Sequence, residues 1–322
     1  MAPDPPIAER FAEELDALIA RGSRVGIAVS GGPDSLALLL LAAAARLGQI
    51  EAATVDHRLR HESAEEAEMV ASVCRSLGVP HEILSAEWSA TPRTAIQERA
   101  REERYRLLAD WAVQRRLDGV ATAHHLDDQA ETFLMRLARG AGVRGLAGMR
   151  PISRVPGSDI PLIRPLLGWR RSELEQVCSA AGLEPARDPS NGDEQFERIR
   201  VRRALRQMDL LEPQSLASSA ANLAQAEAAL EWATQQEWAH TVTNGGVEIV
   251  YRPTDAPSEI RRRIVSRALA RLATEGRESQ LRGRELDRLL VVLGSSGTAT
   301  LRGVRCSGGS EWRFVRAPAR SR

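Results

Sequence analysis

Strand-like apolar runs and amphipathic segments alternate along the first part of the chain. The strand candidates are residues 25–29, 51–56, 80–85 and 118–123. Segments with apolar residues at helical spacing are 7–20, 34–47, 62–77 and 94–116. Strands that alternate with helices of this length predict a Rossmann-like α/β domain, with a parallel sheet and helices on both faces. The run VGIAV at 25–29 has no polar side chain, as expected for a strand buried on both faces.

The pattern changes after residue 140. Residues 140–165 are rich in Gly, Arg and Pro, and we predict loops there. Helical spacing returns at 170–182 and 195–208, and an Ala-rich helix starts near 212, before hairpin-like and helical pieces. We therefore predict a catalytic domain over residues 1–210. A smaller, mainly helical domain with a few strands is expected over residues 211–322.

Charge says little about partners, because Lys and Arg total 44, Asp and Glu total 43, and the net charge is +1. The composition of the cations is more informative, since the chain contains no lysine at all. This excludes a lysine Schiff base, a lysine general base and a P-loop lysine on the phosphates.

Cysteine spacing and hydropathy bear on the compartment. Cys74, Cys178 and Cys306 stand far apart, with no zinc spacing and no disulfide framework, which fits a reducing compartment. The longest apolar run, residues 36–45, is too short for a bilayer, which needs about 20 residues. The acidic N-terminus does not resemble a signal peptide. We predict a cytoplasmic protein with no membrane partner.

The first candidate site is the segment SGGPDS, between the strand at 25–29 and the helix at 34–47. It consists of Ser30, Gly31, Gly32, Pro33, Asp34 and Ser35. Ligands bind at this edge of α/β sheets, and free N–H groups at a helix start attract anions. The glycines let successive N–H groups point inward, and the two serines add hydroxyl donors. Asp34 would repel phosphate, so we predict that it binds Mg²⁺ against the phosphates. The alternative is an ordinary strand–turn–helix connection.

A second candidate site is TAHHLDDQAET, residues 122–132, at the end of the fourth strand. His124 and His125 lie at the same sheet edge as SGGPDS, and are either structural or substrate-binding. Asp127 and Asp128 stand at a helix start, where carboxylates also serve as caps. Asp128 could share Mg²⁺ with Asp34. Glu131, one turn further, can face the same cleft. Zinc is disfavoured, because no cysteine or H-x-x-x-H pair accompanies these residues.

Arginine clusters are candidates for phosphate binding. Arg101 and Arg104 are one helical turn apart, although a solvated helix face with charge pairs is the alternative. The segment FERIRVRRALR carries a denser cluster, made up of Arg198, Arg200, Arg202, Arg203 and Arg206. A third cluster, RRRIVSRALAR at 261–271, is amphipathic, with a solvated face as its alternative. Asp56 is the last residue of the second strand. It either contacts the ligand or caps the end of the strand.

Several segments together resemble a known family. SGGPDS matches the S-G-G-x-D-S loop of the PP-loop (N-type) ATP pyrophosphatases. TVDHRLRH at 54–61, QERAREERY at 97–105, TAHHLDDQAET and GAGVRGLAGM at 140–149 resemble the tRNA(Ile)-lysidine synthetase family within that superfamily. The resemblance covers roughly the first 200 residues well and the remainder only in outline. It implies an ATP-binding catalytic domain over residues 1–210 and a tRNA-binding domain over residues 211–322. RDPSN, before the Arg-rich segment, belongs to the resemblance, but the family usually has Asn where Ile199 stands.

The resemblance implies an activity. Such enzymes use ATP and Mg²⁺ to adenylate C2 of the first anticodon cytidine in an isoleucine tRNA with a CAU anticodon, and free L-lysine then displaces AMP. GAGVRGLAGM holds too many glycines for a helix, so we predict a flexible loop over the cleft, and the resemblance implies that this region meets the substrate. The oligomeric state stays open, with a homodimer as one option.

The resemblance also suggests roles for residues of this chain. The implied catalytic residues are Asp34, Asp128, Arg101 and Arg104. Ser30 to Ser35 and Asp56 would contact ATP. His124, His125, Glu131, Arg198, Arg200, Arg202 and Arg203 would contact tRNA or lysine. Arg101 and Arg104 could hold phosphate or the tRNA backbone, or stabilise charge on the cytosine.

Other activities compete with this one. PP-loop tRNA thiolases share the adenylation step, but they need paired or cluster-ligating cysteines, which these three scattered cysteines do not offer. Synthetases fed by glutamine need an ammonia source, and no amidotransferase domain precedes this one. A nucleotide-sensing module would bind ATP without releasing AMP, and the acids Asp34 and Asp128 argue against it.

Overall fold

The computed structural model describes residues 3–58, 62–88, 96–185, 197–208, 210–273 and 283–317. The segment RDPSN and the residues Leu59, Arg60 and His61 of TVDHRLRH lie outside these ranges. The chain forms two compact units, Met1–Ala224 and Gln225–Arg322, which meet inside helix α9 (Pro213–Thr241). The predicted boundary near residue 210 stands just before this helix.

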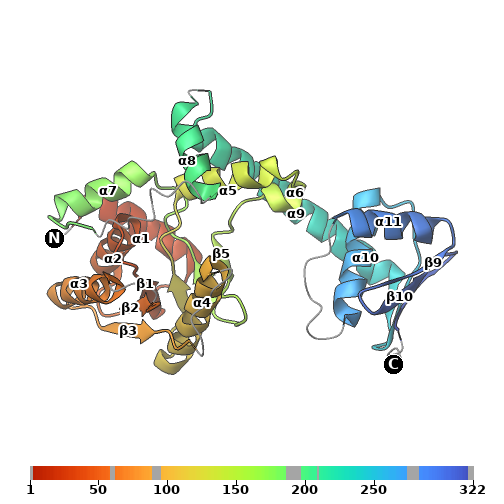
Figure 1. Ribbon diagram of the computed structural model, residues 1–322, viewed down its shortest axis with the longest axis horizontal. Coiled ribbons are helices and arrows are strands. Elements are labelled where there is room, and N and C mark those ends of the chain that lie inside the picture. The colour runs from red at the N-terminus through yellow and green to blue at the C-terminus, as the bar shows by residue number, and fades with distance from the viewer. Residues whose placement is uncertain are drawn as a thin grey trace. The chain divides into compact units, whose positions relative to one another are not determined.

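The first unit is built on a six-stranded sheet (Figure 1). Its strands are β1 (Val25–Ala28), β2 (Ile50–Asp56), β3 (His81–Ser85), β4 (Gly119–Ala121), β5 (Ile152–Arg154) and β6 (Pro161–Ile163). The spatial order is β3-β2-β1-β4-β6-β5, and every pairing is parallel except that of β5 with β6. The predicted parallel sheet is thereby confirmed, with one antiparallel strand added at its edge.

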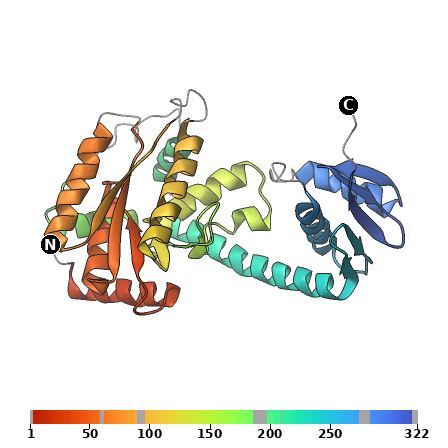
Figure 2. The same ribbon diagram turned by 90° about the horizontal axis from the view of Figure 1, so that it is seen from below.

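Helices cover both faces of this sheet (Figure 2). The helices of this unit are α1 (Pro5–Leu18), α2 (Pro33–Arg46), α3 (Glu62–Leu77), α4 (Ile96–Arg115), α5 (Leu126–Ala138), α6 (Val143–Leu146), α7 (Arg171–Ala180) and α8 (Glu197–Gln207), and α5, α6 and α8 pack on one another beyond the sheet. Buried side chains of α1, α2, α3 and α7 share one apolar core with Val25 and Ile27 of β1. Tyr105 and Trp111 of α4 pack with Val120 in a separate core. The helices therefore change face between β1 and β4, the switch point at which α/β sheets bind ligands.

The glycine in the first strand has a packing reason. A Cβ atom on Gly26 would lie 2.5 Å from the ring of Trp111, far inside van der Waals contact. Glycine lets a helix approach a strand this closely. The apolar run VGIAV therefore keeps its glycine because α4 packs directly upon it.

The loop prediction for residues 140–165 is wrong in part. The segment contains the short helix α6 and the hairpin β5–β6, in which Val155 N–H donates to Ile160 O at 2.9 Å. The Gly and Pro residues that suggested loops form the hairpin turn. The apolar triplet at 161–163 is only three residues long, but it pairs with β4, and this pairing makes it a strand.

Helix α6 also corrects the expectation that residues 140–149 hold too many glycines for a helix. The segment is attached to α5, because Gln129 Nε2 donates to Met149 O at 2.8 Å and Met149 N–H donates to Gln129 Oε1 at 2.7 Å. Arg136 donates to Gly145 O at 2.7 Å. These bonds satisfy backbone groups that a glycine-rich segment would otherwise leave to water.

The second unit contains a five-stranded antiparallel sheet and two helices. They are β7 (Val242–Asn244), β8 (Glu248–Tyr251), α10 (Ser258–Leu272), α11 (Gly283–Gly294), β9 (Thr298–Leu301), β10 (Val304–Ser307) and β11 (Trp312–Arg316). The strand order is β7-β8-β11-β10-β9, and the core includes Ile249, Leu269, Leu289 and Phe314. None of the helices in the described ranges combines the length and apolar character that a membrane span requires.

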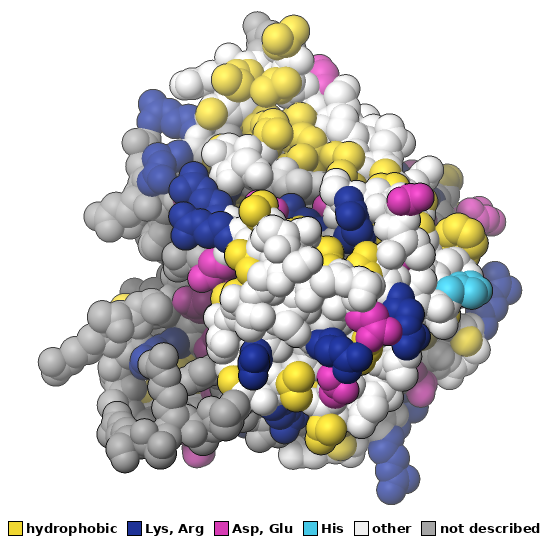
Figure 3. Space-filling model, turned by 90° about the vertical axis from the view of Figure 1, so that its right-hand side faces the viewer, with side chains coloured by type: hydrophobic (Ala, Val, Ile, Leu, Met, Phe, Trp, Pro, Cys, Tyr) yellow, Lys and Arg dark blue, Asp and Glu magenta, His cyan; other side chains and the backbone are white. Residues whose placement is uncertain are grey.

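The arginines of α10 contact the second unit's own part of α9. Arg263 donates to both carboxylate oxygens of Glu227, at 2.8 and 2.6 Å, and the Arg271 guanidinium lies 4.8 Å from the ring centre of Trp238. At least Arg263 and Arg271 of the cluster at 261–271 therefore pack within the second unit. On the face seen in Figure 3, several Arg side chains gather at the upper left, and Arg and acidic side chains are interspersed over the lower part.

Candidate active site

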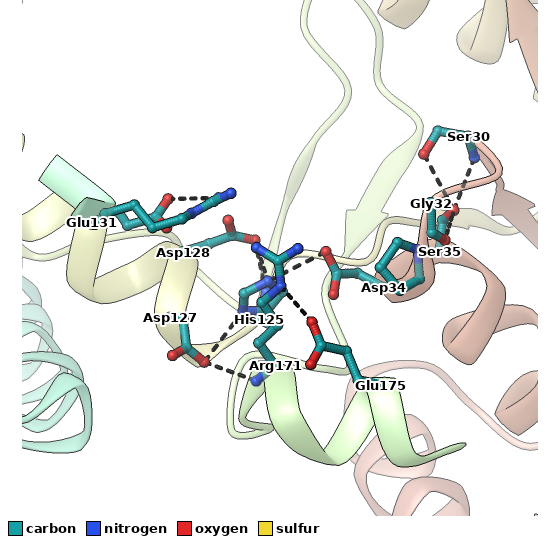
Figure 4. A network of polar contacts seen from close by, with 12 residues as sticks. Ser30, Gly32, Asp34, Ser35, His125, Asp127, Asp128, Glu131, Arg171 and Glu175 are labelled. Atoms are coloured by element: carbon teal, nitrogen blue, oxygen red, sulfur yellow. Dashed lines mark hydrogen bonds and ion pairs between the residues drawn. The ribbon is translucent and has the colours of Figure 1, made fainter. Parts of the chain in front are cut away.

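The loops that carry the two main motifs lie side by side. Strand β1 pairs with β4 in parallel register, so the segments that follow these strands leave the same edge of the sheet. SGGPDS leads from β1 into α2, and HHLDD leads from β4 into α5 (Figure 4). The fold thus brings together two motifs that are about 90 residues apart in sequence.

The SGGPDS segment is closed by its own hydroxyl groups. Ser30 N–H donates to Ser35 Oγ at 3.1 Å, and Ser35 Oγ donates to Gly32 O at 3.0 Å. Gly31 has φ +87°, a conformation that favours glycine. Gly32 is the N-cap of α2, and no side chain caps the helix there. The N–H groups at the start of α2 are consequently available to an anion.

His125 is the centre of a cluster of carboxylates. Its side chain is 1% exposed, with Nε2 3.5 Å from Asp34 Oδ2 and 3.6 Å from Asp128 Oδ2. Its Nδ1 lies 3.6 Å from Asp127 Oδ2. Burial alone would lower the pKa of His125, but the three carboxylates outweigh burial and raise this pKa to about 10. A buried imidazolium therefore joins acids from both loops.

Asp127 links this cluster to α7. Its Oδ2 accepts a hydrogen bond from the backbone N–H of Arg171 at 2.8 Å, and Arg170 lies 3.5 Å from its Oδ1. Burial would raise the pKa of Asp127, but the hydrogen bonds from His125 and Arg171 hold this pKa well below its usual range. The side chain orients His125 and anchors the start of α7, in addition to its place at the start of α5.

The two predicted metal ligands fit a magnesium ion carried by ATP. Asp34 Oδ1 is buried and has no hydrogen-bond partner in the described part of the chain. Asp128 Oδ1 accepts from Arg198 at 3.0 Å. Among the described residues, no group of three or more His, Cys, Asp or Glu side chains has the geometry of a metal site. Mg²⁺ commonly takes one or two carboxylates and completes its shell with phosphates and water.

Glu131 joins α5 to α8. Its side chain is buried and accepts from Arg198 Nε at 2.7 Å and from Arg202 Nε at 2.5 Å. The Arg-rich face of α8 is therefore divided. Arg198 and Arg202 turn toward the acids of α5, whereas Arg200 and Arg203 are exposed and make other contacts.

The side chains of Arg101 and Arg104 on α4 and of His124 after β4 also belong to this region. The guanidiniums of Arg101 and Arg104 lie 5.0 and 5.4 Å from the ring centre of Tyr105. His124 Nδ1 is 2.9 Å from Thr122 Oγ1, and burial lowers the pKa of His124 to about 4. His124 is therefore neutral at pH 7, unlike its neighbour His125.

Asp56 serves the turn after β2. Its Oδ1 accepts from the backbone N–H of Arg58 at 2.8 Å and from the hydroxyl of Ser63. These are the contacts of a strand-end cap, the alternative that the sequence left open. A contact between Asp56 and a ligand would therefore involve Oδ2.

Three arginines of this region were not singled out by the sequence. Arg164 follows β6, and Arg170 and Arg171 stand at the start of α7. A polar residue placed directly after an apolar strand, as in PLIR, is the signal that could have revealed Arg164. It was missed because the strand itself was not predicted.

Comparisons with known proteins agree with this geometry. A family described as the PP-loop domain matches residues 5–208. A tRNA(Ile)-lysidine synthase of Novosphingobium aromaticivorans is 46% identical over 97% of this chain and 94% of that protein. The chain belongs to the tRNA(Ile)-lysidine synthase family. A lysidine synthase of Zymomonas mobilis is 43% identical over 93% of this chain and 90% of that protein.

A solved structure outside the lysidine synthases shares the fold. The U34-tRNA thiolase of Methanococcus maripaludis, solved with its [4Fe-4S] cluster, has a TM-score of 0.55 and 16% sequence identity. The match covers 70% of this chain and 80% of the thiolase. At this identity the similarity is evidence of the fold alone.

Proposed function

We propose that this protein ligates lysine to C2 of the first anticodon cytidine of an isoleucine tRNA with a CAU anticodon, in an ATP-dependent reaction. The observation that carries the proposal is that Asp34 and Asp128, from two different loops, converge on His125 beside the uncapped start of α2. Relatives that match nearly the whole chain bear the name of this activity.

In the first step, the cytidine O2 attacks the α-phosphorus of ATP, and the bond to the β-phosphate oxygen breaks. The N–H groups of Gly31, Gly32 and Asp34 and the Ser30 and Ser35 hydroxyls would bind the phosphates. Mg²⁺, held by Asp34 and Asp128, would supply charge neutralisation and orientation of the phosphates. His125 fixes the two carboxylates relative to each other.

In the second step, the lysine ε-nitrogen forms a bond to C2, the C2–O bond to AMP breaks, and AMP leaves with the bonding electrons. The ammonium must first lose a proton. Both carboxylate oxygens of Glu131 already accept hydrogen bonds from Arg198 and Arg202, which leaves them poorly placed to take this proton. Asp34, whose Oδ1 has no partner among the described residues, is the better candidate.

A thiolase is the closest alternative, and the cysteines argue against it. Cys74, Cys178 and Cys306 are all buried, and burial raises their thiol pKa values to about 12, 11 and 12. They lie on α3, α7 and β10. Sulfur chemistry needs accessible thiolates, which raised pKa values oppose.

The proposal also includes a Mg²⁺ requirement, free L-lysine as the second substrate, a cytoplasmic location and a homodimer as the assembly.

The adenylation step can be tested on its own. ATP labelled at the α-phosphate is mixed with the protein, Mg²⁺ and an isoleucine tRNA transcript with a CAU anticodon, and lysine is omitted. We expect label on the tRNA and release of pyrophosphate, and lysine added afterwards should release labelled AMP. Formation of ADP and phosphate, or ATP binding with no product, would contradict the proposal and favour a different ATPase or a sensor.

A further inference from the structure

Arg164 is a buried guanidinium at the functional edge of the sheet. It directly follows β6, and Thr122 N–H donates to Ile163 O at 3.0 Å, so Arg164 lies beside the end of β4. Arg164 is 9% exposed to solvent. Because neighbouring strands are about 4.8 Å apart, Arg164 stands about 10 Å across the sheet from the SGGPDS loop after β1.

The guanidinium of Arg164 is held in place but not neutralised. NH1 donates to Arg150 O at 2.7 Å and to Ser153 Oγ at 3.0 Å. Nε is buried and has no hydrogen-bond partner in the described part of the chain. No carboxylate within the described residues forms an ion pair with Arg164. A buried charge without a partner is costly, unless a ligand supplies the opposite charge.

Other cations lie close to Arg164. The first half of α4 reaches the same edge, because α4 returns from β3 to the start of the parallel strand β4. Arg101 and Arg104 flank Tyr105 there, and neither has a carboxylate partner in the described ranges. Burial lowers the pKa of Arg164, and the charge of Arg101 lowers it further. Guanidiniums that repel one another in a desolvated place fit an anion between them.

We infer that Arg164 binds a phosphoryl group in this site. The inference rests on the proposed function, because it assigns the group to a substrate of that reaction. Two sources share this chemistry, namely the phosphate chain of ATP and a backbone phosphate of the tRNA. The planar fork of arginine, held by two fixed acceptors, suits two oxygens of either one.

The test measures binding directly, with the full chain and the variants Arg164→Gln and Arg164→Lys. Isothermal titration gives the Kd for Mg²⁺-ATP, and filter binding over a range of salt concentrations gives the Kd for the tRNA transcript. Arg46→Gln is the matched control. Arg46 is also buried and also donates to backbone carbonyls, those of Ile19 and Ala20, but it is paired with Asp16 and ends α2 at the opposite edge of the sheet.

We expect Arg164→Gln to weaken one of the two ligands roughly ten- to hundredfold, the range for a charged hydrogen bond, and Arg164→Lys to weaken it less. A change confined to ATP assigns the nucleotide phosphates. A change confined to tRNA, with a salt slope smaller by about 1, assigns a tRNA phosphate. Both outcomes support the inference.

Unchanged affinity for both ligands in Arg164→Gln would overturn the inference. If the melting temperature then falls as it does in Arg46→Gln, Arg164 is a structural residue. Failure of the proposed function would give a different result. The protein would then form no lysidine, whereas the effect of Arg164→Gln on the Kd for ATP or tRNA would still be measured independently.

Discussion

At the scale of single residues, His125 and its three carboxylates define the site. A histidinium buried among Asp34, Asp127 and Asp128 keeps the acids together in the absence of substrate. Asp34 stands out, because one of its oxygens has no partner among the described residues. We propose that this oxygen binds a cation when ATP binds.

Replacement of Asp34 by Asn tests this role. We expect the rate of pyrophosphate release to fall roughly hundredfold or more, since one electrostatic group at a reacting centre contributes about that much. Asp110→Asn is the control, because Asp110 is an exposed partner of Arg106 on α4. A folded Asp34→Asn variant with near-normal release would show that this carboxylate is not needed.

His124 gives a prediction about pH. Its folded pKa of about 4 lies below the ordinary value of 6.5, so the unfolded chain binds more protons between these values. The contribution of His124 to stability is present above pH 6.5 and is lost as the pH falls toward 4. The free energy of unfolding of the native protein should therefore fall more steeply over this range than that of His124→Gln, measured by urea denaturation. Parallel curves would contradict the buried, neutral state of His124.

Residue types at the loops were predictable, but their pairings were not. Gly and Ser in SGGPDS and the acids in HHLDD are recognisable from the sequence, because they directly follow strands. The sequence does not tell that Glu131 is held by Arg198 and Arg202, since those partners are about 70 residues away and come from a separate helix.

At the scale of elements, α8 is docked on α5 through Glu131. Removal of its charge in Glu131→Gln should lower the free energy of unfolding by about 2–3 kcal/mol. This is less than the ~3–5 kcal/mol of a fully buried pair, because Arg198 and Arg202 keep some solvent contact. The measurement is urea denaturation, with Glu175→Gln as control, because Glu175 forms an exposed pair with Arg171. Equal stability losses in the two variants would exclude a docking role.

Long elements were easier to predict than short ones. Helices such as α2 and α4 have enough residues to show a clear apolar pattern. Strands β5 and β6 have three residues each, and α6 has four, so pairing and side-chain contacts decide their conformation. This is why Arg164, which follows β6, could not be placed from the sequence.

At the scale of the whole molecule, a net charge of +1 conceals local basic sites. Many arginines are committed to carboxylates or carbonyls, as Arg263 is to Glu227. Arg101, Arg104 and Arg164 near the candidate site have no carboxylate partner in the described ranges. The cations available to a polyanion are therefore set by pairing within the fold, and the total charge does not reveal them.

The proposed activity is the transfer of lysine to one particular tRNA. The direct measurement mixes the protein with Mg²⁺-ATP, labelled lysine and an unmodified isoleucine tRNA transcript with a CAU anticodon, with a methionine tRNA of the same anticodon as control. We predict label on the isoleucine tRNA alone, with AMP formed. AMP formed without label on the tRNA would keep the adenylation step but contradict lysine as the nucleophile. The absence of both label and AMP would contradict the proposed function as a whole.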